Sequence, residues 1–362
     1  MELLRHNNLR SSAAISQLAG DIAKISRKPI RLMEVCGGHT MAIQRFGLTS
    51  LLPGNIQLVS GPGCPVCVSS QRYLDACVEL SRLPNVIITT YGDLIRVPAS
   101  RSSLEKERSK GADIRIVYSV SESLALASQN PSKKIVFLGI GFETTAPASA
   151  YTVDEACRLG LQNFFLLSAH KLMPPALRAL VDEELKIDGF IAPGHVSSIT
   201  GTGIYEFLVK DYGKGVVVTG FEPMDLMQSV LQLVTQAETE NPQLVNQYKR
   251  VVKAEGNRKA LTLLNKVFKP ADDYWRGLGI IPLSGLQLSN EYTQFDARSH
   301  FSIHERESTE PKGCICGEIL KGVKQPLDCQ LFNRSCTPDN PVGACMVSSE
   351  GSCAIAYKYN RN

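Results

Sequence analysis

The sequence predicts an α/β protein with two doubly wound, mostly parallel α/β domains followed by a turn-rich C-terminal domain. Eight short apolar runs lie between residues 30 and 219, and most are nearly continuous, as in parallel strands buried on both faces. Helical segments alternate with these runs, which is typical of doubly wound folds. Eight strands favour two open sheets of about four strands each over one barrel. A third observation is that six of the eleven cysteines lie between Cys314 and Cys353.

In chain order, the first predicted element is a helix over residues 1–27, where apolar residues recur at helical spacing before Pro29. The predicted strands are residues 30–35, 56–60, 85–90, 114–118, 134–140, 163–167, 189–192 and 215–219. Helices are predicted between them, for example over 72–80 and 121–128, and the polar run 100–111 is expected to be an exposed helix or loop. Residues 224–238 and 244–268 also have helical patterns, and regular patterning fades from Pro270.

These elements predict three domains. Domain I covers residues 28–119, domain II covers 120–265, and the third domain covers 266–362, packed with the N-terminal helix of residues 1–27.

The net charge of +4 is too mild and too scattered to indicate nucleic-acid binding. No run of apolar residues is long enough for a membrane span, and the N-terminus does not resemble a secretory signal. We therefore expect a cytoplasmic protein, whose cysteines bind metal or do redox chemistry.

Two cysteine-bearing loops follow the first two predicted strands, at the strand ends where open α/β sheets bind ligands. In residues 36–40, Cys36 precedes a helix start, whose amides lower the pKa of a thiol, and His39 could orient or deprotonate it. The alternative is a packed cysteine beside a glycine turn. In residues 61–67, Cys64 and Cys67 form a Cys-x-x-Cys pair, which suits a reversible disulfide or two ligands of one metal.

Two further loops carry an acid and a histidine. Glu143 follows the strand of residues 134–140 and could act as a general acid or base, although Thr144 or Thr145 could simply cap the next helix. His195 follows the strand of residues 189–192, and His170 ends the strand before it. One histidine alone is more often structural than functional. Three cysteines, two histidines and a glutamate at strand ends together predict a thiol-rich site between the two sheets.

The C-terminal segment is rich in glycine and proline and has little apolar periodicity, so it needs a disulfide or a metal to fold. It lacks the paired Cys-x-x-Cys knuckles that zinc often uses, and its spread spacing favours an iron–sulfur cluster. Six thiols would leave four ligands and two thiols that could form a disulfide beside the cluster. Cys77 and Cys157 fall in predicted helices, where we expect both to be buried as small apolar side chains.

Five motifs resemble those of the HypD family of [NiFe]-hydrogenase maturation proteins, in the same order and over nearly the whole chain. They are Cys36-Gly-Gly-His-Thr40, Gly61-Pro-Gly-Cys-Pro-Val-Cys67, Gly141-Phe-Glu-Thr-Thr145, Pro193-Gly-His-Val-Ser197 and Cys345-Met-Val-Ser-Ser-Glu-Gly-Ser-Cys353. The resemblance implies a scaffold and redox protein that works in complex with a HypC-type chaperone. The Fe(CN)₂CO unit would be built on this scaffold, with cyanide from HypE, which acts after HypF. The unit would then pass to the hydrogenase large subunit.

The resemblance also implies roles for residues. Iron would be held between a chaperone thiolate and Cys36, while Cys64, Cys67, His39, Glu143 and His195 would take part in iron binding or in receiving cyanide. A [4Fe-4S] cluster would be bound by Cys314, Cys329, Cys336 and Cys353, with Cys316 and Cys345 as a redox thiol pair.

Two other classes of function compete with this scaffold. One is a stand-alone iron–sulfur thiol–disulfide oxidoreductase, in which the cluster feeds Cys64 and Cys67 and no second iron is bound. The other is a structural zinc protein, which would be colourless. The sequence alone leaves open whether the chain turns over as an enzyme or only holds and hands on a cofactor.

Overall fold

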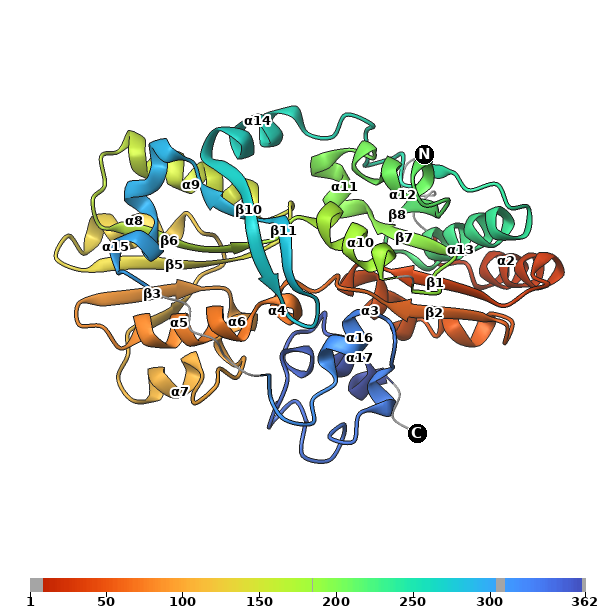
Figure 1. Ribbon diagram of the computed structural model, residues 1–362, viewed down its shortest axis with the longest axis horizontal. Coiled ribbons are helices and arrows are strands. Elements are labelled where there is room, and N and C mark those ends of the chain that lie inside the picture. Colours follow the sequence, from red (N-terminus) through yellow and green to blue (C-terminus); the bar gives the residue numbers. More distant parts are fainter. Residues whose placement is uncertain (1–8, 184, 304–309, 360–362) are drawn as a thin grey trace.

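The computed structural model describes residues 9–183, 185–303 and 310–359, which form two parallel sheets side by side (Figure 1). The first sheet has the order β2-β1-β7-β8-β9 and the second has the order β4-β3-β5-β6. The strands are β1 (Ile30–Glu34), β2 (Ile56–Ser60), β3 (Val86–Thr90), β4 (Ile114–Ile116), β5 (Lys134–Gly141), β6 (Phe164–His170), β7 (Gly189–Pro193), β8 (Gly215–Thr219) and β9 (Leu244–Asn246). All eight predicted strands are present, which confirms the α/β class.

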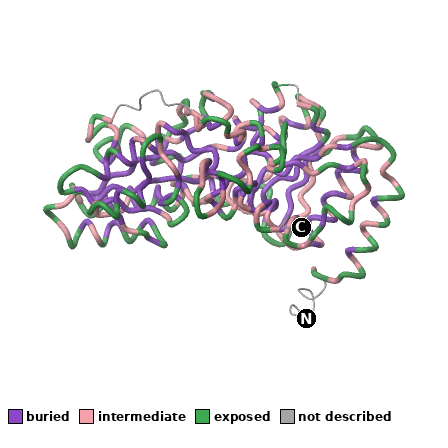
Figure 2. The backbone as a smooth tube through the Cα atoms, turned by 90° about the horizontal axis from the view of Figure 1, so that it is seen from below, coloured by how far each residue is buried: buried purple, intermediate pink, exposed green. Residues whose placement is uncertain are grey.

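Helices cover both sheets, because the strands bury apolar side chains on both faces. They are α2 (Ser12–Ile25), α3 (Gly37–Arg45), α4 (Pro65–Val68), α5 (Gln71–Ser81), α6 (Gly92–Ile95), α7 (Leu104–Ser109), α8 (Glu122–Gln129), α9 (Ala146–Arg158), α10 (Met173–Asp182), α11 (Gly194–Thr200), α12 (Glu206–Lys210), α13 (Pro223–Glu238) and α14 (Arg258–Val267). Buried segments run through the interior of the elongated molecule, along both sheets (Figure 2). Among the described helices, none is long and apolar enough to cross a membrane.

The sheets do not follow the predicted division into residues 28–119 and 120–265. The chain forms β1 and β2, crosses to the second sheet for β3 to β6, and then returns with β7, which pairs with β1 in parallel. Each predicted segment therefore contributes strands to both sheets. Apolar patterning identifies a buried strand but does not determine its neighbours, which is why the crossing was not predicted.

The N-terminal helix lies on the first sheet. Residues 1–8 of the predicted helix fall outside the described residues, and the described part is α2. Its buried face, with Ile15 and Ile22, packs against α13 in one apolar cluster. The prediction placed this helix with the cysteine-rich region, where α3 is instead the partner of the last helix, α17 (Ser352–Tyr359).

The prediction of a helix over residues 244–268 is wrong for its first part. Strand β9 comes first, and α14 begins only at Arg258, after Gly256 adopts a φ of 65° and the Asn257 side chain caps the helix. A positive φ suits glycine and interrupts a helix. The antiparallel hairpin of β10 (Phe268–Trp275) and β11 (Gly279–Leu288) was also missed, and it runs between the two sheets in Figure 1.

The cysteine-rich region consists of turns and short helices, including α16 (Cys316–Leu320) and α17, and it lies where the two sheets meet (Figure 1). The other cysteines are divided between core and surface. Cys77 in α5 is buried, as predicted, whereas Cys157 in α9 is exposed, so the prediction for Cys157 is wrong. Residue 157 lies on the outward side of α9, whose buried residues include Ala150, Val153 and Ala156.

Candidate functional site

The two cysteine-bearing loops of the first sheet are in direct backbone contact. Cys36 is the N-cap residue of α3, and Cys64 is the N-cap residue of α4. The N–H of Gly37 donates to the carbonyl oxygen of Gly63 (3.2 Å), and a Cβ on Gly63 would lie 2.2 Å from the backbone nitrogen of Cys36. Glycine is therefore required at position 63. Cys64 and Cys67 form a disulfide, so in this state neither sulfur is a free thiolate.

The pairing of β7 with β1 brings His195 to Cys36. The Cys36 Sγ lies 3.8 Å from Nδ1 of His195, and the cysteine is 1% exposed. Burial, and then the charge of Glu350, raise the pKa of the Cys36 thiol. The prediction that this pKa is lowered overall is therefore wrong. Backbone N–H groups of His39 and Gly38 do favour the thiolate, but desolvation outweighs them.

His39 is fully buried next to this pair. Burial, and then the proximity of His195, lower its pKa to about 3, so the ring is neutral. Neither ring nitrogen forms a hydrogen bond of normal geometry, although the carbonyls of Thr219 and Gly220 lie close enough to favour a proton. A buried polar group without a partner costs free energy and marks a candidate ligand-binding group.

Phe221 covers this cluster, and the sequence reasoning missed it. Its ring centroid lies 4.8 Å from that of His39 and 5.3 Å from that of His195. A Cβ on Gly38 would lie 3.2 Å from the Phe221 ring, so this glycine allows the ring to lie over the loop. The available signal was its place directly after β8, at the same end of the sheet as the other loops.

Glu143 approaches from the second sheet. Its Oε1 accepts a hydrogen bond from the N–H of Met173 (2.8 Å), while Oε2 is buried without a partner, and burial raises its pKa to about 7. Burial, and then the nearby Glu143 and Cys36, raise the pKa of Tyr205, whose hydroxyl accepts a hydrogen bond from Ser197 (3.3 Å). Thr145 is the N-cap residue of α9, but its side chain does not make the cap hydrogen bond.

His170 is not part of this group. It is fully buried in the second sheet, where its ring nitrogens pair with the hydroxyls of Ser149 and Ser168, each at 3.1 Å. Both of its nitrogens are satisfied, so the structural interpretation holds for this histidine.

A second acid, which the sequence reasoning did not single out, lies next to the Cys36 loop. Glu34, the last residue of β1, is buried and accepts hydrogen bonds on Oε1 from Thr40 (2.6 Å) and Ser60 (2.7 Å). Burial raises its pKa to about 8. Its position at the carboxyl end of a strand, two residues before Cys36, was the signal that could have identified it.

In the C-terminal region, six cysteines line one small apolar cavity, together with Leu331, Phe332 and Met346. Two of them, Cys316 and Cys345, form a disulfide. The other four are free, and the pKa values of two of these, Cys314 and Cys353, are raised by burial and then by their neighbouring thiols. The free cysteines are Cys314, Cys329, Cys336 and Cys353.

No three His, Cys, Asp or Glu side chains among the described residues converge closely enough to hold a single metal ion. A cubane cluster has a different requirement, because each of its four irons takes one thiolate. Four free thiols spaced around an apolar cavity fit that donor set.

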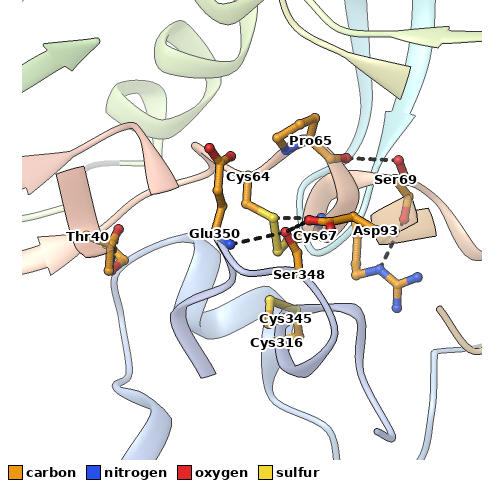
Figure 3. The surroundings of a disulfide bond; sticks show 12 residues. Thr40, Cys64, Pro65, Cys67, Ser69, Asp93, Cys316, Cys345, Ser348 and Glu350 are labelled. Carbon is orange, nitrogen blue, oxygen red and sulfur yellow. Dashed lines mark hydrogen bonds between the residues drawn. A yellow bond between two sulfur atoms is a disulfide. The ribbon is translucent and has the colours of Figure 1, made fainter. Parts of the chain in front are cut away.

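A C-terminal loop lies between the two disulfides, with Ser348 between Cys64–Cys67 and Cys316–Cys345 and Glu350 beside Cys64 (Figure 3). The Ser348 hydroxyl donates to Oδ2 of Asp93 (3.0 Å) and accepts from the N–H of Glu350 (3.2 Å). Glu350 packs so tightly on the Cys36 loop that a Cβ on Gly37 would lie 2.4 Å from its Cβ. The loop therefore contacts both the Cys36 loop, which follows β1, and α6, which follows β3 of the second sheet.

The sequence matches known proteins along nearly its whole length. A family model named HypD, described as "Hydrogenase formation hypA family", matches residues 13–360. The chain is 47% identical to "Hydrogenase expression/formation protein HupD" of Azotobacter chroococcum mcd 1, over 98% of this chain and 96% of that protein. It is 43% identical to "Hydrogenase maturation factor HypD" of Escherichia coli (strain K12), over 100% of this chain and 95% of that protein. It is 44% identical to the protein of that name from Rhodobacter capsulatus, with 96% and 94% covered.

Proposed function

Since this chain belongs to the HypD family of hydrogenase maturation factors, we propose that it is the scaffold on which the Fe(CN)₂CO unit of [NiFe]-hydrogenases is assembled. In this proposal the protein works in complex with a HypC-type chaperone. It receives cyanide from HypE, which acts downstream of HypF. The finished unit passes to the hydrogenase large subunit. The observation that carries the proposal is the buried Cys36 thiol beside His195, where the loops of β1, β2 and β7 meet.

Iron is the cargo of this site. A thiolate is the soft donor that suits low-spin iron with cyanide and carbonyl ligands, so Cys36 is the proposed protein ligand. Burial disfavours ionisation of the Cys36 thiol, and binding of a metal cation would release the thiol proton. The neutral His39 ring is buried, and neither ring nitrogen forms a hydrogen bond of normal geometry. Its N–H would donate a hydrogen bond to a cyanide nitrogen.

Cyanide transfer needs two electrons if the donor is a thiocyanate. Cleaving the sulfur–carbon bond of R–S–C≡N to give R–SH and HCN consumes two electrons and two protons. The Cys64–Cys67 dithiol can supply both, and it becomes the disulfide that the structure contains. Glu143, with its pKa near 7, is the proposed proton carrier on the side of the second sheet. While the disulfide persists, Cys64 and Cys67 cannot act as iron ligands.

The C-terminal cavity fits a [4Fe-4S] cluster held by Cys314, Cys329, Cys336 and Cys353. Such a cluster would supply single electrons when bound. The Cys316–Cys345 disulfide lines the same cavity, and the Ser348 loop lies between it and Cys64–Cys67. This arrangement supports a role for Cys316 and Cys345 in restoring the dithiol after each cyanide transfer.

The test is an infrared spectrum of the anaerobically purified protein with its co-purifying chaperone, together with iron and sulfide assays. Bands in the cyanide and carbonyl stretching region, with iron in excess of the sulfide-matched share, are expected for the scaffold. The second candidate is a stand-alone thiol–disulfide oxidoreductase, which the two neighbouring disulfides favour. Cluster iron alone, with no infrared bands even when the chaperone is present, would support that candidate and refute the scaffold.

A further inference from the structure

One buried cation lies between the two sulfur-rich regions. Arg276 is in the turn that joins β10 to β11, directly after Trp275, and it is only 1% exposed. Burial of a guanidinium costs free energy unless its N–H donors are paired, so the partners of Arg276 indicate which parts of the chain it joins. Its three donor nitrogens all have partners, and these partners come from two different parts of the chain.

The first set of contacts reaches the end of α4, the helix that carries Cys67. The Nε of Arg276 donates to the carbonyl oxygen of Ser69 (3.1 Å), and its backbone N–H donates to the carbonyl oxygen of Val68 (2.9 Å). Its Nη2 donates to Oε1 of Gln71 (3.1 Å). Arg276 therefore satisfies carbonyl groups that the short helix leaves unpaired at its C-terminal end.

The second set of contacts reaches the cysteine-rich region. Nη1 of Arg276 pairs with Oε2 of Glu310 at 2.5 Å, and the chain then turns into Cys314, whose N–H donates to the carbonyl oxygen of Pro311 (3.1 Å). Gly277, which follows Arg276, packs so closely on Gly317 that a Cβ on Gly277 would lie 2.2 Å from the Cα of Gly317. Gly317 directly follows Cys316, which lines the cysteine cavity, so this contact places residues 276 and 277 beside the cavity.

The two charges of this ion pair differ in exposure. The Arg276 side chain is 2% exposed, whereas the Glu310 side chain is 37% exposed, so water screens the carboxylate much more than the guanidinium. The field that reaches the apolar cysteine cavity is therefore dominated by the positive charge. Four thiolates around an iron–sulfur cluster carry net negative charge, which grows when the cluster is reduced.

We propose that Arg276 is a positioning residue that provides the fixed positive charge for the cysteine cavity and ties that cavity to the helix of Cys67. By stabilising the more negative, reduced state of a bound cluster, it sets the reduction potential higher than the cavity alone would. It also keeps the Cys64–Cys67 loop and the cavity in a constant relative position. This inference rests on the proposed function, because it assumes that the cavity holds a cluster.

The experiment compares two variants whose predicted effects have opposite sign. Arg276→Met keeps an unbranched side chain without the charge, so we expect the cluster's reduction potential to fall. Glu310→Gln removes the screening carboxylate and leaves every contact of Arg276 with α4 in place, so we expect the potential to rise. A purely structural role for Arg276 would not produce opposite shifts. Arg276→Lys retains the charge and should shift the potential less than Arg276→Met.

The full-length protein is reconstituted anaerobically, its iron and sulfide content is measured, and its potential is determined by optical redox titration. The matched control is the surface ion pair Arg158–Glu155 on α9, where Arg158→Met and Glu155→Gln should leave the potential unchanged. If Arg276→Met does not fold, Arg276→Gln takes its place, and its potential should also fall. Unchanged potentials at full cluster content would overturn this inference alone. Absence of iron and sulfide in the wild-type protein would refute the cluster itself.

Discussion

Replacement of Gly63 by alanine would test how far the site depends on close contact between the Cys36 and Cys64 loops. A Cβ at this position would lie 2.2 Å from the backbone nitrogen of Cys36 and 2.4 Å from the carbonyl carbon of Val35. Carbon atoms normally approach to about 3.5 Å, so the two loops would have to separate by about 1 Å. Overpacking costs about 1–3 kcal/mol, and because only backbone atoms are in the way, we expect a loss near 3 kcal/mol.

The same displacement should affect chemistry, since a misplacement of about 1 Å at reacting groups can slow a reaction about a hundredfold. Urea unfolding measures the loss of stability, and the growth of cyanide infrared bands with chaperone and cyanide donor measures the transfer. The control is Gly20→Ala in α2, where no atom lies within 4 Å and helix propensity should add up to about 1 kcal/mol. A Gly63→Ala protein with wild-type stability and wild-type band growth would refute the reasoning.

Three other changes probe separate parts of the site. Cys36→Ala should abolish retention of iron in excess of the cluster while the cluster's visible absorption persists, and loss of that absorption would contradict two separate iron sites. Phe221→Ala should speed the alkylation of Cys36 by iodoacetamide, measured by mass spectrometry, because the Phe221 ring covers the Cys36 loop. The control is Phe207→Ala, which removes a ring that contacts Tyr212 and should leave the alkylation rate unchanged. Equal rates in both variants would show that Phe221 does not shield Cys36. Glu143→Gln should remove a pH dependence of unfolding. Burial raises the Glu143 pKa from 4.5 to about 7, so as the pH rises the unfolded state loses this proton at a lower pH than the folded state does. The stability of the wild-type protein therefore falls as the pH rises between these two values, by up to about 3 kcal/mol relative to the variant. A pH-independent difference between the two proteins would argue against a buried, protonated carboxyl.

The strands of the fold were predictable because parallel strands buried on both faces are continuously apolar. The short edge strand β9 and the hairpin were not predictable in this way. Strand β9 has only three residues of intermediate exposure, and β10 carries Lys269, Pro270 and Asp272 on a largely exposed surface. Pairing of β7 with β1 depends on contacts between residues far apart in the sequence, which periodicity does not encode.

The candidate site residues were chosen by their position at strand ends. The structure brings Cys36, His39, His195 and the Cys64 loop together because β2, β1 and β7 are neighbours. Phe221 and Glu350 could not be assigned from spacing, because their roles arise from packing between distant segments. The direction of the Cys36 pKa was wrong for a physical reason. The sequence indicates nearby helix amides but not the complete burial that outweighs them.

The path of the chain between the sheets has a consequence for synthesis on the ribosome. Every strand of the second sheet lies within residues 86–170, so that sheet can close as soon as this stretch has emerged. Strand β1 must wait for β7, and its edge stays unpaired until translation reaches Gly189. At typical elongation rates the wait is on the order of ten seconds. During this time the nascent chain presents an open strand edge with unpaired backbone N–H and C=O groups, and the Cys36 loop next to that edge lacks its neighbour His195.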